Sequence, residues 1–150
     1  MRLEDAIQQP TFRSSHERAH INIIYTASFL SQQTTQVLRP HDISMQQFNI
    51  LRILRGMKGQ AATVKLLTER MLDKMSNASR LVEKLKQKGF VVRRECESDR
   101  RRVDIFITES GQAVVEKATL ALDQKMQQFV ENLTAEEASQ LSHLLDKMRG

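Results

Sequence analysis

The chain of 150 residues has the size of about one domain, and its 40% hydrophobic and 27% charged content is that of an ordinary folded soluble protein. Two prolines, five glycines and no tryptophan favour a mostly helical fold. A chain of this length can bury a core without disulfides or metal. No apolar run approaches ~20 residues, and the start at Arg2, Glu4 and Asp5 is charged, so we expect neither a membrane span nor a secretory signal.

The first predicted element is a long helix. We expect the first dozen residues, broken by Gln8-Gln9-Pro10, to form a loose arm. From Ser15 to Leu38, apolar side chains recur every three to four residues, which is the period of an amphipathic helix. Arg39-Pro40 then ends it, because proline has no backbone N–H to donate.

Three shorter helices follow. Ser44 and Gln47 form the pattern of a capping box, which opens the first of them. The second is predicted over residues 63–72. The third begins at Met75, and Gly89 terminates it in the C′ position.

The most informative stretch of the chain is 99–108. Asp99 and the arginines Arg100, Arg101 and Arg102 come first, and from Val103 to Ile107 every second side chain is aliphatic, which is the period of a strand. Phe90–Arg94 predicts a second short strand just upstream. We therefore expect a β-hairpin whose charged loop carries guanidinium groups into solvent.

Two more helices complete the chain. One starts at Thr108, and Thr134-Ala135-Glu136-Glu137 is a capping box for the last. The fold class is therefore mainly α with a small β-hairpin wing: a winged helix-turn-helix lobe over 44–107, flanked by helices over 15–40 and 108–148. These flanking helices have broad apolar faces, so we expect them to pair with a second copy in a two-fold homodimer.

The positive charge is concentrated in one part of the chain. The net charge is +5, and residues 65–102 hold twelve Lys or Arg against six Asp or Glu, whereas the rest holds eleven against twelve. This excess coincides with the third short helix and the hairpin, as expected for a surface that faces DNA phosphates. A solvated basic face without a partner is the alternative.

Helical spacing divides the residues of the basic helix. Ala78, Leu81, Val82 and Leu85 turn inward, which leaves exposed the N-terminal edge that a helix-turn-helix inserts into the major groove. The expected base-reading residues are Ser76, Asn77, Ser79 and Arg80. Arg80 is the main candidate, through guanine, with phosphate contact alone as its alternative. The expected phosphate contacts are Lys65, Lys74, Lys84, Arg93 and Arg94.

From Ile21 to Leu145 the chain resembles the MarR family of bacterial transcription regulators. The most specific element is Asp99-x-Arg101 followed, after five residues, by Ile107-Thr108, with Gly111 three positions on. Ile107 replaces the leucine that is common in the family. Ser76–Val82 resembles the family's recognition helix, and Lys88–Val91 resembles the entry to its wing.

The resemblance implies roles for the hairpin and for a ligand. Arg101 would enter the minor groove with Asp99 orienting its guanidinium, while Arg100 and Arg102 contact flanking phosphates. The dimer would repress at a pseudo-palindromic double-stranded DNA operator until a small phenolic or other aromatic acid releases it; no cofactor is implied. The residues expected to line the ligand pocket, which could instead be ordinary core, are Ile24, Ser28, Met45, Phe48, Leu51 and Met57.

Other classes of function have weaker support. The sequence has no Gly-rich phosphate loop, nucleophile elbow or paired carboxylates in apolar surroundings, so we do not expect an enzyme. A winged helix used only for protein contacts would not need the cationic wing. A non-specific architectural DNA-binding protein stays open, and it would show little preference for any operator.

Two sensor hypotheses remain as alternatives. The lone Cys96 excludes an intramolecular disulfide and fits a reducing cytoplasm, although a redox switch could use it. His16 and His20 lie four residues apart on one helical face and could bind zinc, but no third or fourth ligand is identifiable. We therefore expect no metal site.

Overall fold

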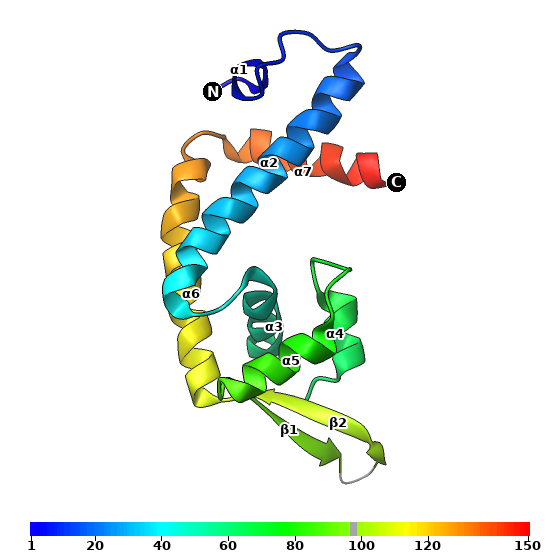
Figure 1. Cartoon of the computed structure of the whole chain (residues 1–150), viewed down its shortest axis with the longest axis vertical. Helices are drawn as coiled ribbons and strands as arrows, with labels where there is room; N and C mark the ends of the chain where they lie inside the picture. The colour runs from blue at the N-terminus through cyan, green and yellow to red at the C-terminus, as the bar shows by residue number, and fades with distance from the viewer. Residues whose placement is uncertain (97–98) are drawn as a thin grey trace. The chain divides into compact units, whose positions relative to one another are not determined.

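The computed structural model describes residues 1–96 and 99–150, of which residues 99–101, 128 and 130 are described by their backbone alone. It is mainly helical with one two-stranded antiparallel sheet (Figure 1), which confirms the predicted fold class. The chain divides into two compact units, Met1–Gln36 and Val37–Gly150. No helix among the described residues is both long and apolar enough to cross a membrane.

The first unit holds helix α1 (Leu3–Ala6) and most of helix α2 (Ser15–Leu38). The prediction of α2 is confirmed, but the prediction of a loose arm is wrong at α1. Leu3 is buried, and the Glu4 carboxylate forms a 2.8 Å ion pair with Nε of Arg18 in α2. These tertiary contacts stabilise α1, which is too short to produce a helical period in the sequence.

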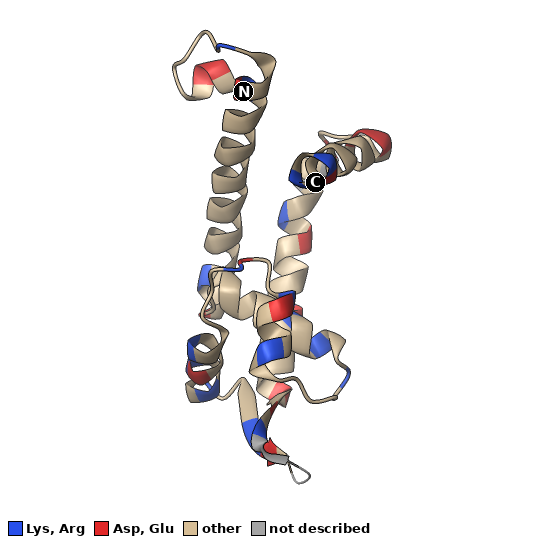
Figure 2. Ribbon diagram, turned by 90° about the vertical axis from the view of Figure 1, so that its right-hand side faces the viewer, with Lys and Arg blue, Asp and Glu red and all other residues tan. Residues whose placement is uncertain are grey.

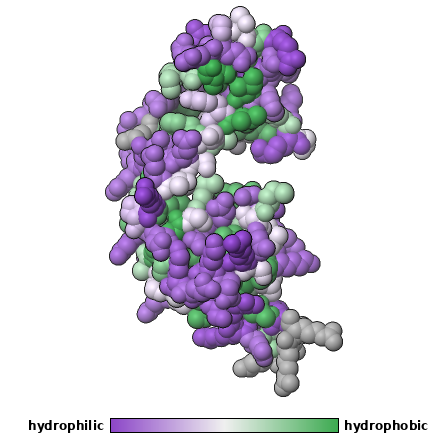
Figure 3. Space-filling model, viewed as in Figure 1, coloured by the Kyte–Doolittle hydropathy of each residue, from purple (hydrophilic) through white to green (hydrophobic). Residues whose placement is uncertain are grey.

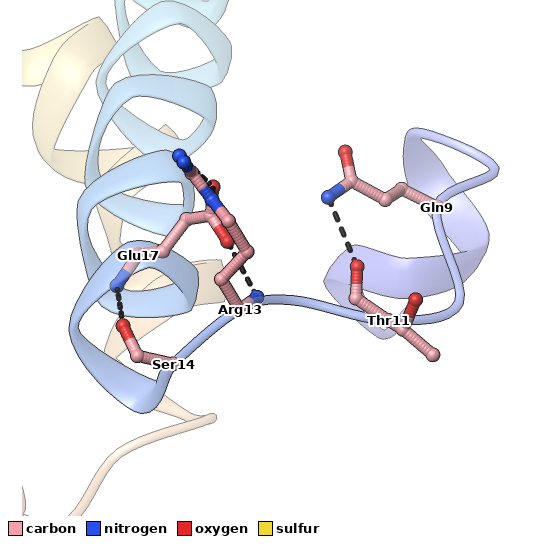
Figure 4. A network of polar contacts seen from close by, with 5 residues as sticks. All are labelled: Gln9, Thr11, Arg13, Ser14 and Glu17. Atoms are coloured by element: carbon pink, nitrogen blue, oxygen red, sulfur yellow. Dashed lines mark hydrogen bonds and ion pairs between the residues drawn. The ribbon is translucent and has the colours of Figure 1, made fainter.

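A polar network opens α2 (Figure 4). The Ser14 hydroxyl accepts the backbone N–H of Glu17 at 3.1 Å. The Glu17 carboxylate in turn accepts Nε of Arg13 at 2.8 Å and the Arg13 backbone N–H at 2.6 Å. These bonds from Arg13 hold the pKa of Glu17 below its ordinary value. Nearby, the Gln9 side-chain amide donates to the Thr11 carbonyl at 3.0 Å.

The second unit contains the helix-turn-helix lobe. A 3₁₀ turn, η1 (Arg39–His41), leads into α3 (Met45–Gly56), and the predicted capping box of Ser44 and Gln47 is present. Helices α4 (Val64–Arg70) and α5 (Ala78–Gln87) follow. Gly89 ends α5 with a φ of +75°, a conformation that glycine adopts without the penalty of a Cβ.

Strands β1 (Val91–Cys96) and β2 (Asp99–Ile107) form the wing, with Val91 opposite Ile107. Ala62 exchanges two backbone hydrogen bonds with Ile105, of 3.0 and 2.8 Å, which ties the wing to the lobe. The prediction that Arg100–Arg102 lie in the hairpin loop is wrong, because pairing between Cys96 and Asp99 extends the ladder and these arginines belong to β2.

One hydrophobic core fixes these elements. Its members come from every element of the lobe and from helix α6 (Glu109–Val130), which packs against α3. The fully buried large side chains are Leu38, Ile50, Leu51, Leu54, Leu67, Met71, Val82, Leu85, Val91, Ile105 and Val115. Helix α7 (Ala135–Arg149) begins with the predicted capping box of Thr134 and Glu137.

Candidate nucleic-acid interface

Helix α5 has one buried face and one basic face. Ala78, Val82 and Leu85 are at most 3% exposed and belong to the core. On the opposite side, Ser79, Arg80 and Lys84 are exposed, and Figure 2 shows where Lys and Arg occur along the ribbon of this lobe. The predicted inward and outward faces of the helix are therefore confirmed for these residues.

The start of α5 differs from the prediction. The helix begins at Ala78 rather than at Met75, because the Asn77 side-chain oxygen accepts the Arg80 backbone N–H at 3.0 Å and caps the helix. The N–H groups of its first turn give this end of the helix a partial positive charge that favours an anion. Asn77 thus has a structural role, which leaves its NH₂ group for a base contact.

Ser76 was predicted to lie on the exposed edge of the helix, but it is half-buried. It belongs to the turn between α4 and α5, and its hydroxyl is buried. The prediction failed because helical spacing was applied to a residue that precedes the helix. The Asp73 carboxylate accepts the Met75 N–H at 3.0 Å. This bond, followed by the Ser76 hydroxyl and the Gln46 side chain, holds the pKa of Asp73 below its ordinary value.

An open depression of about 350 Å³ borders the N-terminus of α5. Four predicted DNA-binding residues line this depression, namely Ser76, Asn77, Arg80 and Lys84. The other lining residues are Gln46, Asp73 and Leu81. Sequence reasoning missed Gln46 and Asp73. A turn-forming Asp between two predicted helices was the available signal for Asp73, whereas no sequence signal placed Gln46 here.

Two further predicted cations lie near this surface. Lys65 is exposed on α4. Lys74 is exposed in the turn, and its ammonium group donates to the Glu69 carbonyl at 2.6 Å. This bond holds the Lys74 ammonium group beside the last turn of α4.

The wing arginines have different partners. Arg93 forms a 3.3 Å ion pair with Glu83 of α5, whereas the Arg94 guanidinium lies 5.4 Å from the ring centre of Phe106. Arg102 pairs with Asp104 at 2.8 Å. The predicted roles of Asp99, Arg100 and Arg101 depend on side chains that lie outside the described part of the chain.

The predicted pocket residues are of three kinds. Ile24, which is 57% exposed, and Ser28 lie on the surface of α2 in the first unit. In the second unit, Leu51 is fully enclosed in the core. Partly buried residues pack against that core, namely Met45, Phe48 and Met57.

The residues of the two sensor hypotheses lie in different elements. His16 and His20 are exposed on α2, and Glu17 between them is bound to Arg13. Across the described residues, no three His, Cys, Asp or Glu side chains are placed to hold a metal ion. Cys96 is half-buried at the last position of β1.

Known proteins share this arrangement. A family model described as "MarR family" matches residues 41–102. The Multiple antibiotic resistance protein MarR of Escherichia coli K12 is 31% identical over 114 residues, which cover 75% of this chain and 78% of that protein. The chain belongs to the MarR family. It is therefore a DNA-binding transcription regulator from a family of non-enzymes, with a winged helix-turn-helix fold whose wing is the β1–β2 hairpin.

Two solved structures agree with the MarR fold. The S. aureus MepR–DNA complex is 25% identical, with a TM-score of 0.75, and the match covers 90% of this chain and 96% of that chain. RdhR-CbdbA1625, bound to 2,4-dichlorophenol, is 21% identical with a TM-score of 0.81 and coverages of 91% and 80%. The second likeness shows the MarR fold alone.

Proposed function

We propose that this MarR-family chain is a homodimeric regulator that reads a pseudo-palindromic double-stranded DNA operator through α5. The observation that carries the proposal is the exposed face of Arg80 and Lys84 on a helix whose other face, through Val82 and Leu85, is fixed in the core. Such a rigid, capped helix can hold a guanidinium against a guanine edge with little loss of conformational entropy. Phosphate contacts from Lys65, Lys74 and Lys84 then position the helix.

The wing adds a second contact in this proposal. Arg101 enters the minor groove and Asp99 orients it, while Arg100 and Arg102 contact the flanking phosphates. The described part of the wing supports this role, because Ala62 and the Arg93–Glu83 ion pair fix the hairpin to the lobe. A fixed hairpin can deliver arginine to a narrow minor groove, whose negative potential attracts it.

Two copies of the chain complete the regulator. Residues Ala19–Leu38 of α2 contain no Asp, Glu, Lys or Arg. Large apolar side chains remain exposed on the C-terminal helices and the link between them, namely Leu120, Met126, Leu133, Leu141, Leu144 and Met148. A second copy can cover these side chains. The two-fold dimer then presents two α5 helices to half-sites about 34–36 Å apart.

A small aromatic or phenolic effector regulates this binding in our proposal. The related RdhR-CbdbA1625 structure contains 2,4-dichlorophenol, which supports this chemical class for the fold. Binding of the effector lowers the population of dimers that can reach both half-sites, so it releases the operator and ends repression.

The decisive experiment measures DNA binding by fluorescence anisotropy across a salt titration. The probe is the duplex immediately upstream of the protein's coding region, and a scrambled duplex is the control. We expect salt-dependent binding of one dimer and a preference of about 10³–10⁷ for the operator. If the protein also binds operators selected from a random duplex library no more tightly than it binds random duplex, the proposal is wrong and an architectural role replaces it.

Two variants separate reading from positioning. Arg80→Ala should weaken the free energy of binding to the operator by about 1–3 kcal/mol, because it removes a base contact. The loss on the scrambled duplex should be smaller. Arg101→Ala should weaken binding to both duplexes and reduce the salt slope. Lys117→Ala, which removes an exposed cation of α6, is the matched control and should leave both affinities unchanged. Equal losses on both duplexes for Arg80→Ala would contradict its role as a base reader.

A further inference from the structure

Two large apolar side chains are exposed in the turn between α4 and α5. Leu72 is 78% exposed and Met75 is 94% exposed. The other exposed large apolar side chains of the described chain are Met1 or lie on α2, on α6 and α7, or on the link between the last two. A second copy covers those helices in the proposed dimer, but the dimer gives no role to Leu72 and Met75. On the face drawn in Figure 3, most of the surface of the lobe is hydrophilic.

The turn that carries Met75 is ordered. Its backbone N–H donates to the Asp73 carboxylate at 3.0 Å, and the Ser76 N–H donates to the Asp73 carbonyl at 3.2 Å. At the other end of the turn, the Leu72 N–H donates to the side chain of the buried Asn49 at 2.9 Å. The exposure of Met75 is therefore imposed by hydrogen bonds that fix the path of the backbone.

The position of Met75 points toward DNA. It precedes the cap Asn77 by two residues, so it stands at the positive end of the recognition helix, beside the depression lined by Arg80 and Lys84. This end of a helix-turn-helix enters the major groove. The apolar group available there is the C5 methyl of thymine, and the unbranched, polarisable methionine side chain adapts to such a contact.

We propose that Met75 is a specificity residue that contacts a thymine methyl group in each operator half-site. The inference rests on the proposed function and adds an apolar reader to the arginine reader. Leu72 lies two residues after the end of α4 and three residues farther than Met75 from the cap Asn77, so we assign the contact to Met75 alone.

The test replaces thymidine by deoxyuridine, which removes only the methyl group. An operator is first obtained from a random duplex library with the wild-type protein, and each thymidine is then replaced in turn. At one position per half-site, we expect a loss of about fourfold in affinity for each methyl removed. Met75→Gln keeps the length of the side chain but ends in an amide; it should weaken binding to the thymidine duplex similarly and lose the response to deoxyuridine. Met75→Leu should keep the response.

Controls isolate this contact from the others. Leu72→Gln removes an exposed apolar side chain from the same turn and should keep the wild-type response, and Lys74→Ala should weaken binding to both duplexes equally. An unchanged response in Met75→Gln, no methyl-sensitive position, or a response lost only in Leu72→Gln would each overturn the inference and leave the proposed function standing. If no sequence can be selected at all, both fail.

Discussion

Gly111, in the first turn of α6, allows the backbone at Phe90 to approach this helix closely because glycine has no side chain. A Cβ at this position would overlap the Phe90 carbonyl oxygen and lie 2.9 Å from Cγ1 of Ile107. The Phe90 carbonyl accepts the Thr108 N–H at 3.0 Å, so moving it away would break that bond. Gly111→Ala is therefore expected to lower the free energy of unfolding by about 1–3 kcal/mol.

Urea unfolding followed by circular dichroism measures this loss, and Gly56→Ala is the matched control. Gly56 is the last residue of α3, and a Cβ there would meet nothing within 4 Å. The alanine should therefore be neutral or stabilising by up to about 1 kcal/mol, through helix propensity. Similar midpoints for both variants would contradict the close approach at Gly111.

Individual residues of the interface differ in how far the sequence could predict them. The inward positions of Ala78, Val82 and Leu85 follow from helical spacing alone, and the structure agrees. Ser76 could not be placed in this way, because the burial of its hydroxyl depends on the path that Asp73 gives to the turn. The exposure of Met75 depends on the same path.

At the scale of elements, local chemistry predicted the two helix starts that depend on a capping box. Ser44 and Thr134 each open a helix through a capping box that was visible in the sequence. Two features were missed, because they depend on contacts that periodicity and capping patterns do not show. Helix α1 is held by the ion pair of Glu4 with Arg18, and the ladder of β2 extends through the pairing of Asp99 with Cys96.

The position of the recognition helix depends on its buried face. Leu85 has no exposed surface, and its carbonyl accepts the Phe90 N–H at 2.9 Å, where the chain leaves α5 for β1. Leu85→Ala should therefore lower the free energy of unfolding by about 2–5 kcal/mol through lost burial and the cavity that remains. Thermal unfolding measures the loss. Lys86→Ala, at the neighbouring exposed position, should change it little; equal effects would contradict the packing of α5.

At the scale of the whole molecule, charge and apolar surface lie in separate parts of the chain. Residues 65–102 hold twelve basic against six acidic side chains, while Ala19–Leu38 holds no charged residue. In Figure 2, Lys and Arg appear on the lobe and the wing and also on α6 and α7, whereas α2 is almost free of them. The sequence alone predicts this separation. The partner that covers the apolar part could only be proposed, since a single chain leaves α7 exposed.

The dimer itself gives the last prediction. Leu144 is 53% exposed on α7, in a helix whose apolar side chains include Leu141 and Met148. Leu144→Asp places a carboxylate on this face, and pairing of two copies would remove water from it at a cost in free energy. Sedimentation velocity should show a shift from dimer toward monomer, and operator affinity should fall because a monomer presents only one α5. Leu72→Asp, at a more exposed apolar residue of the lobe, should leave the mass unchanged. A wild-type monomer, or a Leu144→Asp dimer of undiminished stability, would contradict pairing through α7.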